Sequence, residues 1–445
     1  MSYIPSTIDE RARMLAAVGA ESYDALYKDV PQNLIFRGRF NNVAEDGLSE
    51  FEVKERVQSI AAKNKAYKAV FRGAGAYNHL IPSCVTHLVS RSEFVTAYTP
   101  YQPEISQGIL QAIFEYQTTA CALTGMDVSN ASVYDGATAA AEAVSMCVEK
   151  NKRKAIISQT VNPNTLDVIK TYCKALNVET VLCPEKDGKT NVDALVLLID
   201  NNTACAYVET PNFYGVIEDG EGIAGAVHSR GAKLIAGVNP VSLAVLKTPA
   251  EYGADIAVCE GQPLGMPLSF GGPYLGIMAC KKAMMRRLPG RIVGQTADKD
   301  GKRAFVLTLQ AREQHIRREK AQSNICSNQA LCALTAAIYC AAMGPEGLKE
   351  VAYRSMANAA YLKERLKAIG FTPVHSGDTF HEFVTESPVK ASKALTALDK
   401  KGVLGGLPLP GNRILWCATE ANTKEQIDGV IQALSVHSET THGAQ

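Results

Sequence analysis

The chain has 445 residues, with 46 Lys and Arg against 45 Asp and Glu, and a formal charge of +1. This length predicts two or three domains, and the near neutrality argues against a protein that binds nucleic acid through net charge, so we expect no nucleic-acid partner. Apolar runs stay below the roughly 20 residues of a bilayer span, and residues 1–10 lack a basic cluster and an apolar stretch, so we expect no membrane segment and a cytoplasmic location.

The 12 cysteines are scattered singly, and no C-x-x-C pair occurs. Zinc sites usually combine such pairs with nearby histidines, so we expect no metal site. The sequence also lacks the motifs H-E-x-x-H, G-x-S-x-G and G-x-x-x-x-G-K-[ST]. Zinc peptidase, serine hydrolase and P-loop nucleotide-binding functions therefore have no motif to support them.

The N-terminal part reads as helical and irregular. Thr7 and Glu10 have the spacing of a capping box, and apolar residues follow at helical spacing until Gly19. Residues 31–132 are rich in Gly, Pro, Tyr and Asn, and irregular segments of this length are usually functional or interfacial. We therefore expect residues 1–130 to form an N-terminal segment that takes part in an interface.

From residue 154 to 281, short apolar runs alternate with amphipathic helical ones, which predicts a mainly parallel sheet wrapped by helices. The expected strands are residues 155–158, 180–183, 204–209, 233–237, 255–259 and 275–279. A helix is expected over 330–343, with another beginning at Gly344 and Pro345. Strands near 380–385 and 413–418 and a helix over 423–434 complete the pattern. It predicts a large α/β domain over 131–330 and a small C-terminal α+β domain over 331–445.

Ligands of α/β sheets lie at the carboxyl ends of the strands, and anions lie at helix N-termini. The residues Asp135, Gly136, Ala137 and Thr138 lead directly into a predicted helix. Their small side chains would leave backbone N–H groups accessible to a phosphate. The alternative is an ordinary capped helix start.

Two further strand ends lead into loops, at residues 236–240 and 260–273. A pyridoxal phosphate enzyme on this scaffold would need an acid near the first, to keep the ring nitrogen protonated, and a lysine in the second, for the Schiff base. These places hold Ala236 and Gln262. The sequence therefore lacks both groups.

Several segments together closely resemble the glycine cleavage system P-protein family. They are YTPYQPEISQG (98–108), NAS (130–132), TAAAEA (138–143), PNFYGVIED (211–219) and REQHIRREKA (312–321). The resemblance extends from Thr7 to about Leu434, and it is to the N-terminal half of the fused P-protein, which in many bacteria is a separate subunit 1, or alpha chain. It implies the pyridoxal-phosphate-dependent transferase fold type I, with a large domain built on a mainly parallel sheet and a small C-terminal α+β domain.

The resemblance also implies a function. With a beta subunit, such a chain decarboxylates glycine through pyridoxal phosphate, releases CO2 and transfers the aminomethyl group to the lipoyl arm of H-protein, in an alpha2beta2 heterotetramer. The beta-type half carries Asp-Gly-Ala-Asn where this chain has Ala236 to Asn239, and His-Lys-Thr where it has Gly261, Gln262 and Pro263. We therefore expect the beta subunit, and not this chain, to bind the cofactor covalently.

Polar residues of an irregular, proline-containing segment are expected to reach into the partner's active site. They are Tyr98, Tyr101, Gln102 and Ser106, joined by Asn78 and His79. A surface loop packed by its own tyrosines, with a structural His79, is the alternative.

Two more segments are candidates for contacts with partners. Ser269, Gly271 and Gly272 expose N–H groups to which the partner's cofactor phosphate could bind, or else they form a tight turn. Residues 312–320, at helical spacing, would present two basic faces suited to the acidic lipoyl carrier, unless they form a solvated helix.

Two other functions stay open at this point. The chain could be a non-catalytic structural partner of the beta chain that never touches substrate. It could instead be a self-sufficient pyridoxal phosphate enzyme that uses Lys247 or Lys281.

Overall fold

The computed structural model describes residues 6–38, 40–41, 47–321 and 323–442. The chain divides into two units, residues 1–66 and residues 67–445, each described here by itself. The domain boundaries expected at residues 130 and 330 stay predictions.

The first unit consists of short helical segments joined by irregular chain. They are α1 (Ile8–Ala17), η1 (Asp24–Tyr27), η2 (Gln32–Leu34) and α2 (Glu50–Ala61). The predicted capping box is confirmed, because the Glu10 N–H donates to the Thr7 hydroxyl and the Thr7 N–H donates to the Glu10 carboxylate at 2.7 Å. None of the residues described in this unit is buried.

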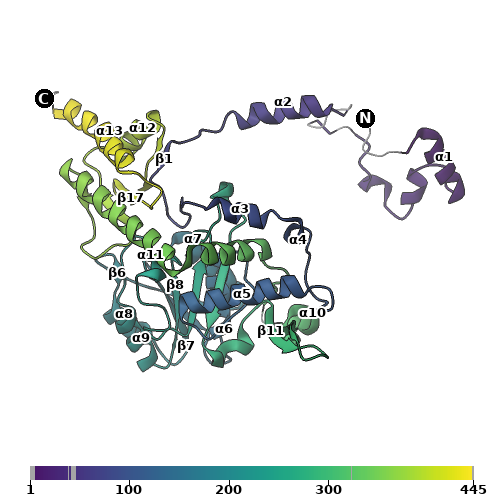
Figure 1. The fold of residues 1–445 in the computed structure, drawn as a ribbon, viewed down its shortest axis with the longest axis horizontal. Coiled ribbons are helices and arrows are strands. Elements are labelled where there is room, and N and C mark those ends of the chain that lie inside the picture. Colours follow the sequence, from purple (N-terminus) through teal and green to yellow (C-terminus); the bar gives the residue numbers. More distant parts are fainter. Residues whose placement is uncertain (1–5, 39, 42–46, 322, 443–445) are drawn as a thin grey trace. The chain divides into compact units, whose positions relative to one another are not determined.

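A seven-stranded sheet forms the centre of the second unit (Figure 1). Its order is β2 (Val128–Ser129), β10 (Gly276–Cys280), β9 (Ile256–Glu260), β8 (Lys233–Val238), β7 (Thr203–Glu209), β3 (Lys154–Ser158) and β4 (Glu179–Cys183). Only β10 runs antiparallel to its neighbours, and the strands from β9 to β4 are parallel. The six strands predicted in this region and their mainly parallel arrangement are confirmed.

Helices cover both faces of this sheet. Successive side chains of a strand point to opposite faces, so a strand that is apolar throughout needs a helical layer on each side. Ile157 of β3 packs in one core cluster with α6 (Gly136–Cys147) and α7 (Pro163–Ala175), while Ile156 packs in another with α8 (Val192–Leu198) and α9 (Gly220–Ser229). Ten of the 12 residues of α6 are buried. Its run of alanines lets it lie close against the sheet.

The second unit also holds further helices and short strands. They are α3 (Ser83–Val89), α4 (Ser92–Val95), α5 (Gln107–Thr124), β5 (Glu185–Lys186), β6 (Lys189–Thr190), η3 (Ser242–Ala244), η4 (Ser269–Gly271), η5 (Lys282–Arg287) and the hairpin of β11 (Ile292–Ala297) and β12 (Arg303–Thr308).

The long helix α11 (Ala330–Ala368) is interrupted at Gly344, whose φ of 62° is left-handed, and Pro345 follows. The predicted helix over 330–343 and the new start at Gly344 are thus confirmed. By length and composition alone α11 could cross a membrane. Its Ala336 and Tyr339 pack in one core cluster and its Leu362 packs in another, so it is a core helix of this fold.

The C-terminal part is an antiparallel sheet covered by helices. Its strand order is β13 (Thr372–Pro373), β14 (Glu382–Glu386), β17 (Arg413–Cys417) and β16 (Leu407–Leu409), and the helices are α12 (Ala391–Lys400) and α13 (Lys424–His442). Trp416 lies fully buried in its core. The short strands β1 (Ala69–Val70) and β15 (Val403–Leu404) pair in parallel as a separate two-stranded sheet, which ties the start of the second unit to the C-terminal part of the chain.

The single helix expected over residues 312–320 is wrong. The segment folds as η6 (Gln310–Arg312), α10 (Gln314–Arg317) and η7 (Arg318–Lys320), because Arg318 has a φ of 53° that no continuous helix allows. The guanidinium of Arg312 donates instead to the carbonyls of Leu288 and Gly290.

Candidate functional site

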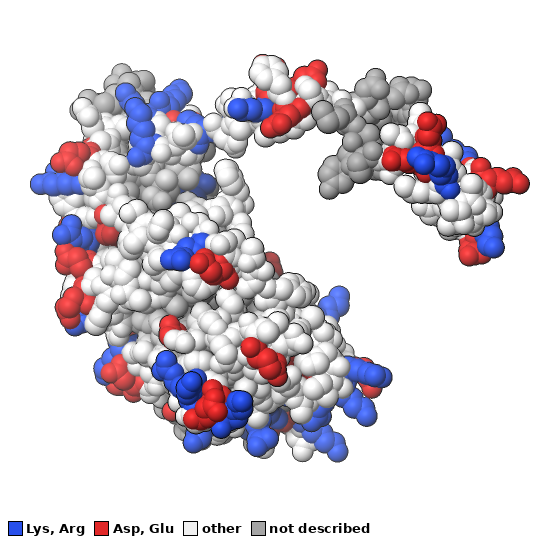
Figure 2. All heavy atoms as spheres, turned by 45° about the vertical axis from the view of Figure 1, so that its right-hand side comes forward, with Lys and Arg blue, Asp and Glu red and all other residues white. Residues whose placement is uncertain are grey.

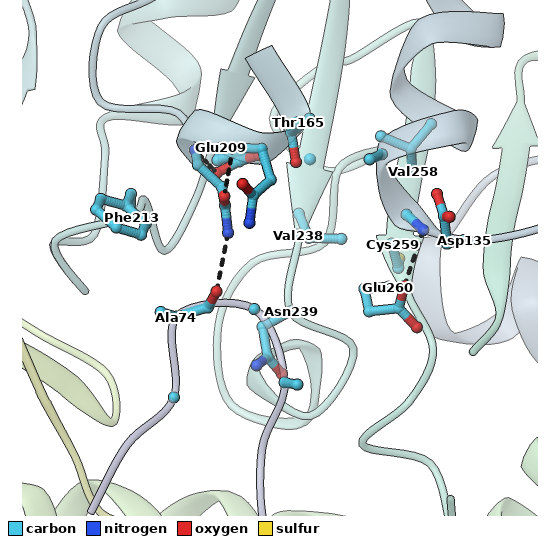
Figure 3. Close-up of a pocket in the computed structure, with 18 of the residues that line it drawn as sticks. Ala74, Asp135, Thr165, Glu209, Phe213, Val238, Asn239, Val258, Cys259 and Glu260 are labelled. Atoms are coloured by element: carbon cyan, nitrogen blue, oxygen red, sulfur yellow. Dashed lines mark hydrogen bonds between the residues drawn. The ribbon is translucent and has the colours of Figure 1, made fainter. Parts of the chain in front are cut away.

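A cavity of about 460 Å³ lies at the carboxyl ends of the central strands (Figure 3). Its walls come from the residues after β3, β7, β8 and β9, from the start of α6, and from a loop at residues 73–77. Polar side chains that line it include Tyr77, Asp135, Asn162, Asn164, Thr165, Tyr207, Glu209, Asn239, Glu260 and Glu382. This is where open α/β sheets bind their ligands.

Gln262 holds the loop at residues 73–77 in place. Its side-chain oxygen accepts from the Tyr77 N–H at 2.8 Å, and its side-chain nitrogen donates to the carbonyls of Tyr77 at 2.9 Å and Met266 at 2.8 Å. Gln262 is fully buried. An amide can make this two-way pairing with a backbone because it carries both a donor and an acceptor, whereas a lysine carries only donors.

Two carboxyl groups, the half-buried Glu209 and the buried Glu382, line the cavity beside this loop. Glu209 accepts from the Asn162 N–H at 2.8 Å and from the Tyr207 hydroxyl at 3.0 Å. Glu382 accepts from the Ala74 N–H at 2.7 Å and from the Tyr77 hydroxyl at 2.8 Å. Burial raises the pKa of each to about 7, although these hydrogen bonds oppose the shift.

Glu260 projects to the N-terminus of α6. Its carboxylate accepts three backbone N–H groups, from Gly136 and Gln262 at 2.9 Å each and from Leu275 at 3.1 Å. Burial raises its pKa to about 7 against these three bonds. The Asp135 side chain accepts from the Thr138 N–H at 2.7 Å, so the capped helix start, the alternative reading of residues 135–138, is what the structure contains.

These residues do not fit pyridoxal phosphate. None of the described residues that line the cavity is Lys, Arg or His, and a carboxylate already accepts the Gly136 N–H at the position where a phosphate would lie. The Gln262 side chain is directed at the Tyr77 backbone. Ala236 is 2% exposed and packs in the core, while its neighbours on β8 line the cavity.

The cavity also offers no metal site. Within the described ranges, no three His, Cys, Asp or Glu side chains come close enough to hold an ion. Neither lysine considered for a self-sufficient enzyme lines the cavity. Each is instead paired with a carboxylate, Lys247 with Glu221 and Lys281 with Asp255 at 3.0 Å. The structure therefore does not support that alternative.

The predicted segment around Tyr98 lies apart from the residues that line this cavity. Tyr98 is 89% exposed, Gln102 is exposed, and Ser106 precedes α5. The Tyr101 hydroxyl accepts from the Arg291 guanidinium at 3.0 Å, and Arg291 is 4% exposed. A buried arginine thus fixes a tyrosine that is itself exposed.

The other predicted residues lie in two separate places. The Asn78 side chain is exposed, while His79 is buried and its Nδ1 lies 2.7 Å from the Glu420 carboxylate. Ser269 and Gly271 belong to η4, Gly272 follows it, and Gly271 lines the cavity. Whether these residues contact a partner's site stays a prediction.

Reasoning from the sequence missed the three glutamates of the cavity. Glu209 and Glu260 are the last residues of β7 and β9, so the strand-end rule could have found them. Glu382 comes from the C-terminal sheet, and nothing in the local sequence pattern places it there.

Comparison with known proteins gives the family. A family model described as "Glycine cleavage system P-protein" matches residues 1–434. A relative from Moorella thermoacetica, named probable glycine dehydrogenase (decarboxylating) subunit 1, is 51% identical over 442 residues, which cover 98% of this chain and 99% of the relative. A relative of the same name from Carboxydothermus hydrogenoformans is 48% identical, with coverage of 98% and 99%.

Solved structures agree. A crystal structure of glycine decarboxylase (P-protein) of the glycine cleavage system, in inhibitor-bound form, is 42% identical, has a TM-score of 0.90 and covers 98% of this chain and 100% of that chain. A Burkholderia pseudomallei sphingosine-1-phosphate lyase, 13% identical with a TM-score of 0.66 and coverage of 91% and 93%, shares the fold alone. The predicted fold class, pyridoxal-phosphate-dependent fold type I, is confirmed, and the chain belongs to the glycine cleavage system P-protein family.

Proposed function

We propose that this chain is subunit 1 of a glycine dehydrogenase (decarboxylating). Together with a second subunit it decarboxylates glycine, releases CO2 and transfers the aminomethyl group to the lipoyl arm of H-protein. The observation that carries this proposal is the similarity to relatives named subunit 1, which extends over 98% of the chain. Such a match is not confined to one shared domain.

In this proposal the second subunit binds pyridoxal phosphate covalently and this chain does not. The absence of a lysine among the described residues of the cavity wall supports it, as do the three hydrogen bonds of the Gln262 side chain. The residues of this chain would complete the partner's site and exclude water from it.

The proposal includes an extensive interface with the second subunit, in an alpha2beta2 assembly. The exposed apolar side chains of the first unit support this part of it. A short helix without a packed face is marginal in water, and exposed apolar side chains in such numbers indicate a docking surface. These side chains include Ile8, Met14, Val18, Tyr23, Leu26, Leu34, Phe36, Phe51, Val57 and Ile60. On the face that Figure 2 shows, wide areas of the second unit also carry no charged side chain, as in the core of a typical interface.

We assign Tyr98, Tyr101, Gln102 and Ser106, with Asn78 and His79, to contacts with the partner's active site, and Ser269, Gly271 and Gly272 to its cofactor phosphate. Tyr98, Gln102 and Asn78 are exposed, as direct contacts require, whereas His79 is buried. The Tyr101 oxygen accepts a hydrogen bond from Arg291. The proton of the Tyr101 hydroxyl is therefore available for donation to a substrate carboxylate or to the lipoyl arm.

Docking of the acidic H-protein would use the exposed basic groups of residues 315–320. Arg312 is excluded from this surface, because its guanidinium binds backbone carbonyls inside the fold. Arg317, Arg318 and Lys320 are exposed.

Reconstitution tests the proposal. This chain and a glycine dehydrogenase subunit 2 are produced separately and assayed, alone and mixed, for release of labelled CO2 from glycine in the presence of lipoylated H-protein. We expect activity in the mixture only. If subunit 2 alone is as active as the mixture, this chain is at most a structural partner.

A further inference from the structure

We infer that Glu260 keeps phosphate compounds out of this chain by occupying, with its own carboxylate, the anion position at the N-terminus of α6. The inference deepens the proposed function and rests on it in one respect, namely that this chain carries no cofactor. The exclusion of phosphate compounds is thereby assigned to Glu260, a residue for which the sequence analysis predicted no role.

The N-terminus of a helix attracts anions because its first N–H groups have no partner within the helix. In α6 two of these groups are already bound by carboxylates of the same chain. Glu260 accepts from Gly136 at 2.9 Å, and Asp135 accepts from Thr138 at 2.7 Å. The two acceptors come from different parts of the chain, Glu260 from the end of β9 and Asp135 from the residue that precedes the helix.

The fit between Glu260 and Gly136 is close. A Cβ placed on Gly136 would lie 2.8 Å from the Cβ of Glu260, so only glycine allows this approach. The other oxygen of Glu260 accepts from the N–H groups of Gln262 and Leu275. All three partners are donors, which is the arrangement that a carboxylate requires.

The position is reachable from outside, because Gly136, Ala137 and Glu260 all line the cavity. An incoming phosphate would therefore meet two carboxylates and no cation among the described lining residues. Gln262 cannot form a Schiff base, because its side chain carries no amine. This leaves open the binding of a phosphate compound without a covalent bond, and Glu260 is the group that prevents it.

Equilibrium dialysis of the full-length chain against pyridoxine 5′-phosphate at pH 8 tests the inference. This compound has no aldehyde and so does not react with surface lysines. We expect Glu260→Ala to bind it at least tenfold more tightly than the parent chain. Pyridoxine, which lacks the phosphate, should show no such gain. Glu209→Ala, which removes another carboxyl of the same cavity that does not contact α6, is the matched control and should bind like the parent.

Glu260→Gln is the second variant, because it keeps the side-chain volume but cannot accept all three N–H groups. It should gain at least threefold, and it decides the question if Glu260→Ala does not fold. Folded variants that bind no more tightly than the parent overturn the inference alone. Tight binding by the parent overturns the inference and also contradicts the proposal that this chain carries no cofactor.

Discussion

Replacing Gln262 with alanine should loosen the loop at residues 73–77, which lines the cavity. The substitution removes three hydrogen bonds, two to Tyr77 and one to Met266, each between 2.8 and 2.9 Å. Opening the loop breaks only the two bonds to Tyr77, so at about 1 kcal/mol for each bond the free energy of opening the loop should fall by about 2 kcal/mol. Because 1.36 kcal/mol is a factor of ten, local opening becomes about thirtyfold more frequent.

Hydrogen exchange measured by mass spectrometry reports this opening directly, since the Tyr77 N–H is one of the bonded groups. Peptides that contain Tyr77 should exchange about thirtyfold faster in Gln262→Ala. Gln111→Ala is a matched control, because Gln111 makes only a surface bond to Glu115 on the same helix. Unchanged exchange at Tyr77 in a folded Gln262→Ala chain would show that other contacts hold the loop.

Three further outcomes are expected. Gln262→Lys should yield no reduced phosphopyridoxyl-lysine, because the side chain at this position is directed at the Tyr77 backbone and not into the cavity, and a mass-mapped label there would contradict this. Tyr101→Phe and Gln102→Ala should each lower glycine decarboxylation by the assembled enzyme at least tenfold, about 1.4 kcal/mol, while assembly persists, and parental turnover would make the segment a scaffold. Because folding raises the pKa of Glu382 from 4.5 to about 7, the native chain holds more protons than the unfolded chain in that window, and its stability falls as the pH rises through it. Urea unfolding at pH 5 and pH 8 should show that Glu382→Gln loses on the order of 3 kcal/mol of this dependence, and an unchanged dependence would assign it to other groups.

The central sheet could be predicted because its signal is local. Each buried strand is a short apolar run, and the alternation of runs with amphipathic helices specifies parallel strands. The failure at residues 312–320 has an equally local cause. The basic residues of this segment have helical spacing, which predicted one helix. The left-handed backbone at Arg318, which ends the helix, cannot be predicted from the spacing of side chains, because Arg318 is not a glycine.

The contacts of the site could not be predicted from the sequence. Comparison with the beta-type pattern predicts that Gln262 stands at the position of the cofactor lysine, and this stays a prediction. The partner of its side chain, Tyr77, lies 185 residues away in the sequence. Glu382 reaches the same loop from 308 residues away. Contacts of this range depend on how the C-terminal sheet packs, and no short motif specifies them.

The most direct test of the account is to locate the cofactor in the active assembly. The reconstituted enzyme is reduced with borohydride in the presence of pyridoxal phosphate, digested and mapped by mass spectrometry. The account predicts a stoichiometric phosphopyridoxyl-lysine on the second subunit and none on this chain. A stoichiometric label on any lysine of this chain would contradict it.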